Sequence, residues 1–282
     1  MIRRIRRSGR AVGVGVVILW SLVPVYWALN TSLMTNSEAQ STPVHFFPTH
    51  PVFANYEALF GAGPQSANAG GGIGRSVINI AIESGGATIL TLIVAVLGAY
   101  AFARLRFRLK NFLFYTVLLT LTLPIYATLI PLYHIMSELG LVDTYLGIIL
   151  VYTSGFIPLA MWIMYNVFLS LPPSIEEAAR VDGASTFQTF WKIALPIASP
   201  GIAATAIIAF LLGWGQFIFP LVLSSSNSTA PLTVTLAALE GRHVVPFTII
   251  NAAAVVAIAI PAVLVFVLNR WIIQGIIAGS VK

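Results

Sequence analysis

Cysteine and charge are the two features in which this sequence is poorest. The 282 residues include no cysteine, which excludes disulfides, thiol catalysis and thiolate metal sites. Charged residues make up only 9% of the chain and apolar residues 58%, against about 25% and roughly 45–50% in ordinary soluble domains. A soluble fold covers its surface with charge, so this composition excludes a soluble protein. The high apolar content also excludes a disordered chain.

Long stretches without charge account for this composition. Six of them are long enough to cross a bilayer core of roughly 30 Å as helices, and only the second contains an acid or base, Glu83. None alternates apolar and polar residues as a barrel strand does. The sequence therefore predicts an all-α membrane protein with six transmembrane helices. The six runs are Ala11–Leu33, Val77–Ala103, Asn111–Met136, Tyr145–Leu169, Gly201–Leu223 and Phe247–Asn269.

The distribution of basic residues predicts the orientation. If the N-terminus is cytoplasmic and the chain crosses six times, 13 of the 15 Lys and Arg residues lie inside, and only Arg75 and Arg242 lie outside. The first apolar run is too long for a cleaved signal peptide, so we expect it to be retained. The predicted parts are a basic N-terminus (1–10), the first transmembrane helix (11–33), an extracytoplasmic loop (34–76), a five-helix core (77–270) that includes the loop 170–200, and a cytoplasmic tail (271–282).

Residues 170–200, which we call the elbow, have the pattern of two short helices rather than of a simple loop. Ser174 and Glu177 have the spacing of a capping box and follow two prolines, so we expect a helix over Ile175–Asp182. Gly183 can adopt the left-handed conformation that ends such a helix. The elbow is therefore predicted to turn sharply at Gly183.

The second part of the elbow is predicted to be a short helix capped by Ser185, running through Ile193 and limited by Pro196. Only Arg180 and Lys192 are basic here, which excludes a DNA-binding helix-turn-helix. Packing of the elbow on its own helices remains an alternative to partner binding. Four apolar residues are more than a solvated loop needs, namely Val181, Phe187, Phe190 and Trp191.

At these residues the sequence resembles the permease subunits of ATP-binding-cassette importers. Their signature is Glu-Ala-Ala, a Gly, and Ile-x-Leu-Pro, and it stands here as Glu177-Ala178-Ala179, Gly183 and Ile193-x-Leu195-Pro196 with every spacing kept. The longer form around it, including Asp182, resembles the sugar-importer branch, as does the run Gly98–Phe107. The resemblance covers nearly the whole chain and is to the second permease of maltose-type systems.

The resemblance implies a fold, partners and residue roles. The fold is that of a type I importer permease, in which the elbow couples this chain to ATP hydrolysis. The partners are a second permease, two cytoplasmic ATPases that hold ATP and Mg, and an extracytoplasmic solute-binding protein; the chain itself is not an enzyme and binds no cofactor. Among the coupling residues, Glu177 contacts the ATPase, Ala178 and Ala179 allow close approach, Gly183 sets the angle, and Phe187 and Ile193 pack the elbow.

Three polar or aromatic residues inside the runs are candidates for a solute pathway. Trp214 and Gln216 could stack on and hydrogen-bond a sugar ring, and Tyr126 stands between two prolines. Helix packing is the alternative for each of them. Glu83 is expected to reach the outer surface or to pair with Arg75. The four histidines lack the spacing of a metal site.

These patterns leave more than one transport function open. The sequence favours a permease for a sugar or sugar-like polyol, with glycerol-phosphate-type solutes as the alternative. A self-sufficient secondary transporter would leave the elbow unexplained. No P-loop occurs in the chain, so it cannot hydrolyse ATP by that route. A membrane enzyme would need grouped Asp, His or Ser residues at one depth, and the sequence has no such group.

Overall fold

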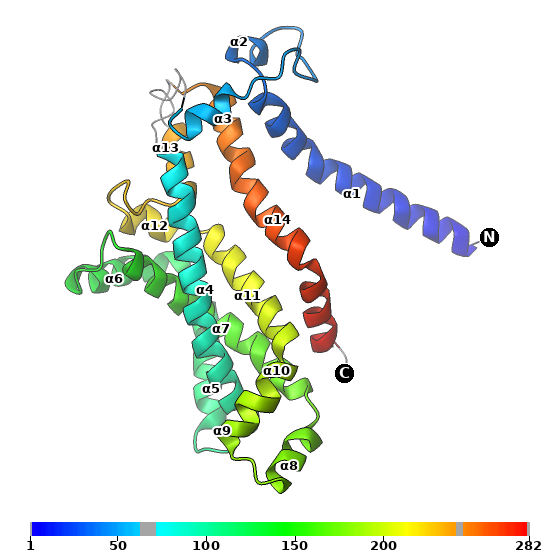
Figure 1. Ribbon diagram of the computed structural model, residues 1–282, viewed down its shortest axis with the longest axis vertical. Helices are drawn as coiled ribbons and strands as arrows, with labels where there is room; N and C mark the ends of the chain where they lie inside the picture. Colours follow the sequence, from blue (N-terminus) through cyan, green and yellow to red (C-terminus); the bar gives the residue numbers. More distant parts are fainter. Residues whose placement is uncertain (1, 63–71, 241–244, 281–282) are drawn as a thin grey trace. The chain divides into compact units, whose positions relative to one another are not determined.

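The structure is a computed structural model that describes residues 2–62, 72–240 and 245–280. These residues form helices, turns and loops, and no strand occurs within the described ranges, which confirms the predicted all-α class. The chain divides into two compact units, each of which is built from two separate segments. Figure 1 gives the helix labels used below.

The first unit consists of residues 1–75 and 234–260. Its centre is the buried side chain of Asn55, whose amide nitrogen donates hydrogen bonds to the carbonyl oxygens of Ser32 and Met34, both at 2.8 Å. The amide oxygen accepts a hydrogen bond from Thr248 at 3.2 Å. Asn55 therefore ties α3 to the end of α1 and to the start of α14. The helices of this unit are α1 (Ile2–Ser32), α2 (Asn36–Ala39), α3 (Ala54–Leu59), and parts of α13 (Leu232–Glu240) and α14 (Phe247–Ser280).

The second unit consists of residues 76–233 and 261–282, and it holds the elbow. Helix α7 is its central helix and packs against α11, where a Cβ added to Gly201 would lie 2.6 Å from a methyl group of Val167. Small residues at such crossings let helix backbones approach closely in a membrane. Its helices include α4 (Ile73–Arg104), α5 (Lys110–Leu119), η1 (Thr120–Thr122), α6 (Ile125–Glu138), α7 (Tyr145–Ser170), α11 (Ser199–Trp214) and α12 (Ile218–Leu223).

Four helical segments are long and apolar enough to cross a membrane. The four are Gly13–Ser32, Ile73–Arg104, Tyr145–Ser170 and Phe247–Leu268. Up to six spans result if each of two bent helix pairs counts as one, namely Lys110–Thr122 with Tyr126–Glu138 and Thr186–Ile197 with Ser199–Trp214. The structure is thus consistent with six spans, but two of the predicted spans are not single helices.

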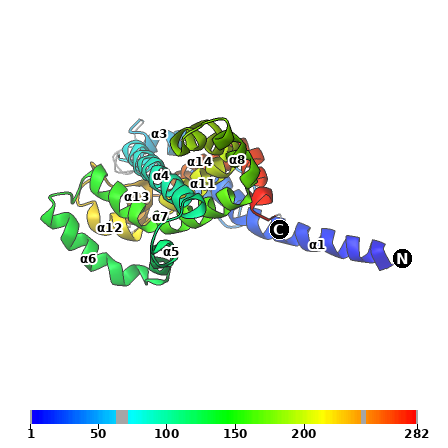
Figure 2. The same cartoon turned by 90° about the horizontal axis from the view of Figure 1, so that it is seen from below.

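The third predicted span is broken where Leu123 and Pro124 adopt extended backbone, and the helices on either side meet at 106° (Figure 2). Proline disfavours helical backbone at the residue before it, which explains the break. The fifth predicted span, Gly201–Leu223, ends at Trp214 and resumes as α12 after Gly215–Phe217. Each of these two predicted spans is therefore interrupted.

Candidate functional site

The first elbow helix, α8, spans Pro173–Val181 and begins earlier than predicted. Pro172 is its N-cap and no side chain caps it, so the predicted capping box of Ser174 and Glu177 is wrong. Pro173 explains the shift, because a proline without an N–H group fits the first helical position. Glu176 therefore lies in the first turn, where the helix dipole favours an acid.

The end of α8 is the sharp turn expected at Gly183. This glycine has a φ of +84°, and its N–H donates to the carbonyl of Arg180 at 3.1 Å. The N–H of Ala184 donates to the carbonyl of Ala179 at 2.9 Å. Together these bonds form a Schellman motif, which needs a left-handed residue at this position. The prediction of a left-handed Gly183 is confirmed.

The second part of the elbow begins with the predicted Ser185 cap but extends further than expected. Ser185 and Gln188 form a reciprocal capping box at the start of α9 (Thr186–Thr189). The chain continues through a π-helical turn, η2 (Phe190–Ala194), into α10 (Leu195–Ile197). Pro196 therefore does not end the helix. The helical direction changes by 72° only before α11 begins at Ser199.

A buried ion pair joins the elbow to the end of α4. The Nε of Arg104 lies 2.9 Å from Oε1 of Glu176, and both side chains are almost fully buried, at 11% and 6% exposure. Arg104 also donates from Nη2 to the carbonyl oxygen of Leu171 at 2.5 Å. Arg180 lies 3.8 Å from Glu176 on the exposed side. Removing either member of such a buried pair leaves an uncompensated charge, so α4 and α8 are firmly connected.

Aromatic packing surrounds this ion pair. The Tyr100 hydroxyl donates to Oε2 of Glu176 at 3.4 Å, and its ring lies 5.3 Å from Phe168 and 4.8 Å from Phe190. These three rings come from α4, α7 and the π turn, and all are buried. Aromatic pairs at such separations add to the stability gained from burial. The elbow is thus held by packing as well as by charge.

The apolar residues of the elbow divide between an inner and an outer side. Phe190 is buried, whereas Val181, Phe187 and Trp191 are 88%, 72% and 49% exposed. The expectation that Phe187 packs the elbow is wrong, and Phe190 has that role. We call Val181, Phe187 and Trp191 the outer apolar face. Of the other predicted coupling residues, Glu177, Ala178, Asp182, Gly183 and Pro196 are exposed, Ile193 and Leu195 are half-buried, and Ala179 is buried.

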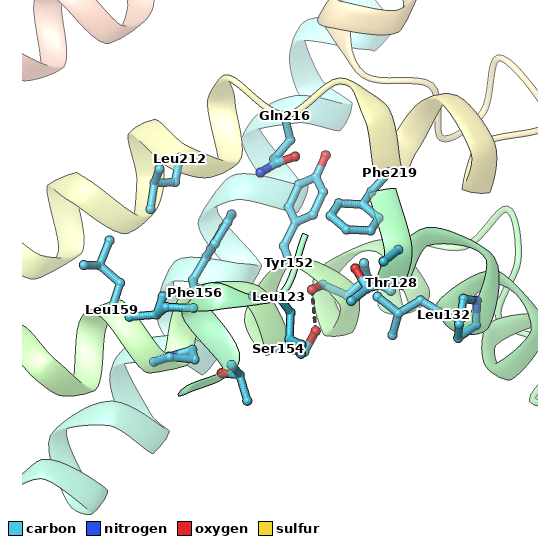
Figure 3. Close-up of a pocket in the computed structure, with 17 residues that line it drawn as sticks. Leu123, Thr128, Leu132, Tyr152, Ser154, Phe156, Leu159, Leu212, Gln216 and Phe219 are labelled. Atoms are coloured by element: carbon cyan, nitrogen blue, oxygen red, sulfur yellow. Dashed lines mark hydrogen bonds between the residues drawn. The ribbon is translucent and has the colours of Figure 1, made fainter. Parts of the chain in front are cut away.

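A cavity of about 630 Å³ lies further along the second unit, between α6, α7 and the α11–α12 junction (Figure 3). Its walls combine the aromatic rings of Tyr152, Phe156 and Phe219 with the amide of Gln216. Figure 3 shows Gln216, from the break between α11 and α12, and Tyr152, from α7, reaching the same part of the cavity. Its lining residues, all described, include no charged side chain; they are Thr120, Leu121, Leu123, Ala127, Thr128, Pro131, Leu132, Val151, Tyr152, Ser154, Gly155, Phe156, Pro158, Leu159, Leu212, Gln216 and Phe219.

Of the three residues predicted for a solute pathway, only Gln216 lines this cavity. Trp214 is buried and stacks on Phe210 one turn earlier, with ring centroids 5.6 Å apart. Tyr126 is 70% exposed near the start of α6. The sequence did not single out Tyr152, Phe156 or Phe219, because nothing distinguishes one aromatic residue from another within a uniformly apolar run.

Glu83 does not reach a surface, contrary to expectation. It is fully buried in α4, and neither carboxyl oxygen has a hydrogen-bond partner among the described residues. No ion pair with Arg75 occurs in the described part of the chain. Where α4 crosses α11, a Cβ added to Gly213 would lie 3.0 Å from Ser84, the next residue. The close packing of α11 on α4 at Ser84 helps to bury the adjacent Glu83.

Within residues 2–62, 72–240 and 245–280, no group of three potential metal ligands occurs. Arg242 and His243, and Lys282 at the C-terminus, lie outside the described residues. Three histidines are described, and none of them lines the cavity.

Residues 87–278 match the family model described as "Binding-protein-dependent transport system inner membrane component". The chain is 34% identical to a diacetylchitobiose uptake system permease protein of Streptomyces coelicolor, with 98% of this chain and 88% of that protein covered. It is 29% identical to a sulfoquinovosyl glycerol transport system permease protein of Agrobacterium fabrum (97% and 93% covered). It is also 27% identical to an sn-glycerol-3-phosphate transport system permease protein of Yersinia pestis (94% and 92% covered).

A solved structure has the same fold. It is a chain of a bacterial ABC transporter involved in the import of the acidic polysaccharide alginate. The TM-score is 0.78 at 26% sequence identity, and the match covers 95% of this chain and 96% of that chain. The similarity in fold therefore extends over nearly the whole of both chains.

Proposed function

Because this chain belongs to the family of binding-protein-dependent transport system inner membrane components, we propose that it forms, with a second permease, the membrane pathway of an ATP-driven importer for a sugar or sugar-like solute. The observation that carries the proposal is the elbow with its outer apolar face. Three large apolar side chains at 88%, 72% and 49% exposure need a partner to cover them. Relatives over nearly the whole chain are permeases of sugar uptake systems.

The partner that we propose for the elbow is a cytoplasmic ATPase. The sequence has no nucleotide-binding motif, so ATP and Mg would be held entirely by two ATPase subunits. The outer apolar face of Val181, Phe187 and Trp191 would enter a surface groove of one of them, beside the exposed carboxylate of Glu177. The second permease would present an equivalent elbow to the other ATPase.

The buried ion pair supports a route from the ATPase to the membrane helices. Closure of the two ATPases would pull the elbows together, and Arg104 and Glu176 would carry that movement into α4. Such rigid coupling can drive alternating access, in which the spans move from an inward-open to an outward-open arrangement. Both chain termini and the elbow would then lie on the cytoplasmic side, where 13 of the 15 basic residues are placed.

The cavity of about 630 Å³ is the part of the pathway that this chain would contribute. Aromatic rings and an amide are the groups that pack on and hydrogen-bond a sugar. A glycerol-phosphate-type solute, such as that in the name of the Yersinia relative, remains the second candidate. It would need cations from the second permease, because no lining residue of this cavity is charged. The extracytoplasmic binding protein would deliver the solute.

Purification and reconstitution test this proposal. The chain should copurify with a second permease and two ATPase copies. Vesicles that contain this assembly should take up the solute retained by the binding protein, and only when ATP is supplied. Transport by the isolated chain without ATP would contradict the proposal.

A further inference from the structure

Two adjoining cavities lie beside the turn that joins α4 to α5. The first, of about 750 Å³, lies between this turn and the elbow, and the second, of about 390 Å³, lies at the start of α5. They share Arg106 and Lys110. The first is also lined by Ala103, Arg104, Leu105, Pro173, Glu176, Glu177, Arg180 and Thr186, and the second by Phe107, Leu109, Asn111 and Phe112.

The first cavity has an excess of positive charge. Four basic and two acidic residues line it. Glu176 faces Arg104 and Arg180, at 2.9 and 3.8 Å. Arg106 and Lys110 have no ion pair among the described residues, and Lys110 donates to the carbonyl of Leu105 at 3.2 Å, which holds it across the turn. Two cations are thus available for an anion.

The second cavity provides an apolar surface next to these cations. Phe107, Leu109 and Phe112 are 41%, 69% and 66% exposed. A ligand that fills both cavities would need an anionic group joined to long apolar chains. Free phosphate would leave the apolar residues uncovered. An acidic protein side chain would likewise cover only the charged cavity.

We propose that the two cavities bind one anionic phospholipid, with its phosphate at Arg106 and Lys110 and its acyl chains along Phe107, Leu109 and Phe112. Basic pockets at the cytoplasmic ends of membrane helices suit such headgroups. Arg180 of the elbow also lines the first cavity, so the bound lipid would lie beside the elbow. The inference rests on the placement of this turn at the cytoplasmic surface and is independent of the solute carried.

Lipid titration of the full-length chain tests the site. The delipidated protein in neutral detergent is titrated with fluorescent phosphatidylglycerol and with phosphatidylcholine of the same chain length. Wild-type protein should prefer phosphatidylglycerol. Arg106→Ala and Lys110→Ala should each weaken its binding about 5-fold, because a basic residue near an anionic headgroup contributes about that factor. Lys110→Arg keeps the charge and should keep the affinity.

Arg108→Ala is the matched control, because Arg108 lies in the same turn but lines neither cavity. Its affinity should equal that of wild type. An equal loss in Arg108→Ala would show that only the net charge of the turn matters and would overturn the site. Equal affinity for the two lipids would also overturn it. Displacement of the lipid by inorganic phosphate, or by the docked ATPase, would assign the cavity to those occupants instead.

Discussion

Arg104, at the end of α4, and Glu176, in the elbow, form a buried ion pair with Nε and Oε1 2.9 Å apart. The same guanidinium donates to Leu171, where the elbow leaves α7. Two segments that are distant in sequence, the end of α4 and the start of the elbow, are therefore fixed around one arginine. Movement of the elbow cannot leave α4 in place without breaking these contacts.

Removal of either partner should destabilise the protein. Arg104→Ala and Glu176→Ala should each lower the free energy of unfolding by on the order of 3 kcal/mol, because the remaining charge is buried without compensation. Arg180→Ala is the control; its side chain is 52% exposed and 3.8 Å from Glu176, so the loss should be below about 1 kcal/mol. Thermal unfolding of the purified variants measures the difference. Equal effects of all three would contradict a special role for the buried pair.

Asp143, in the loop before α7, should make the free energy of unfolding depend on pH in the acid range. Burial alone would raise its pKa, but hydrogen bonds from Thr229 and Ser226 outweigh burial and hold the pKa below its ordinary value. The contribution of the Asp143 carboxylate to the free energy of unfolding is therefore complete above about pH 4, the ordinary pKa of an Asp side chain. It is lost as the pH falls through the lowered pKa.

Asp143→Asn should cost about 1 kcal/mol at neutral pH. The difference in melting temperature between wild type and Asp143→Asn should narrow below about pH 4. A difference that stays constant down to acid denaturation would show that the carboxylate charge is not responsible.

Tyr152 and Gln216 should affect transport without affecting ATP hydrolysis in the absence of solute. Gln216→Ala removes a hydrogen-bonding amide from the cavity wall and Tyr152→Leu removes one of its aromatic rings, so uptake of the solute carried by the binding protein should fall roughly 5- to 10-fold. Basal ATPase activity and solute binding by the binding protein should persist. Tyr126→Phe, on an exposed ring outside the cavity, should transport normally. Normal uptake by both cavity variants would place the pathway elsewhere.

Single cysteines test the orientation, since the natural chain has none. Ser226 and Lys192 are both exposed in the structure. Ser226→Cys should react with a membrane-impermeant thiol reagent in intact cells, and Lys192→Cys should react only after the membrane is opened. The reverse pattern would mean that the elbow faces outward.

The predictions from sequence succeeded where the deciding interactions are local. Gly183 ends α8 and Ser185 caps α9 because the bonds involved join residues within one turn. The Ser174 cap was wrong because the adjacent Pro173 begins the helix instead. Phe187 was expected to pack the elbow in place of Phe190 because the two residues stand one turn apart, and only the contacts of Phe190 with Tyr100 and Phe168 distinguish them.

Features that depend on tertiary contacts could not be predicted from the sequence. The pairing of Arg104 with Glu176 brings together the end of one helix and a distant loop. The cavity forms where α6 bends away from α5 and where α11 stops short of α12. The apolar runs on either side carry no periodic pattern that would indicate which of their faces line it. Pro124 lies inside an apolar run, where a proline can kink a helix, but the 106° angle of the bend could not be predicted from the sequence.

The elbow's role in coupling is tested most directly at Gly183. Its φ is +84°, a backbone conformation that residues other than glycine rarely adopt. Gly183→Val adds strain of on the order of 1 kcal/mol and should change the direction of α9. Gly85→Ala is the control, because Gly85 has ordinary helical backbone and open space around its Cβ position. The measurement is ATPase stimulation by loaded binding protein, together with solute uptake, in reconstituted vesicles. Gly183→Val should lose both while Gly85→Ala keeps both; normal stimulation and uptake in Gly183→Val would show that the elbow does not couple ATP hydrolysis to transport.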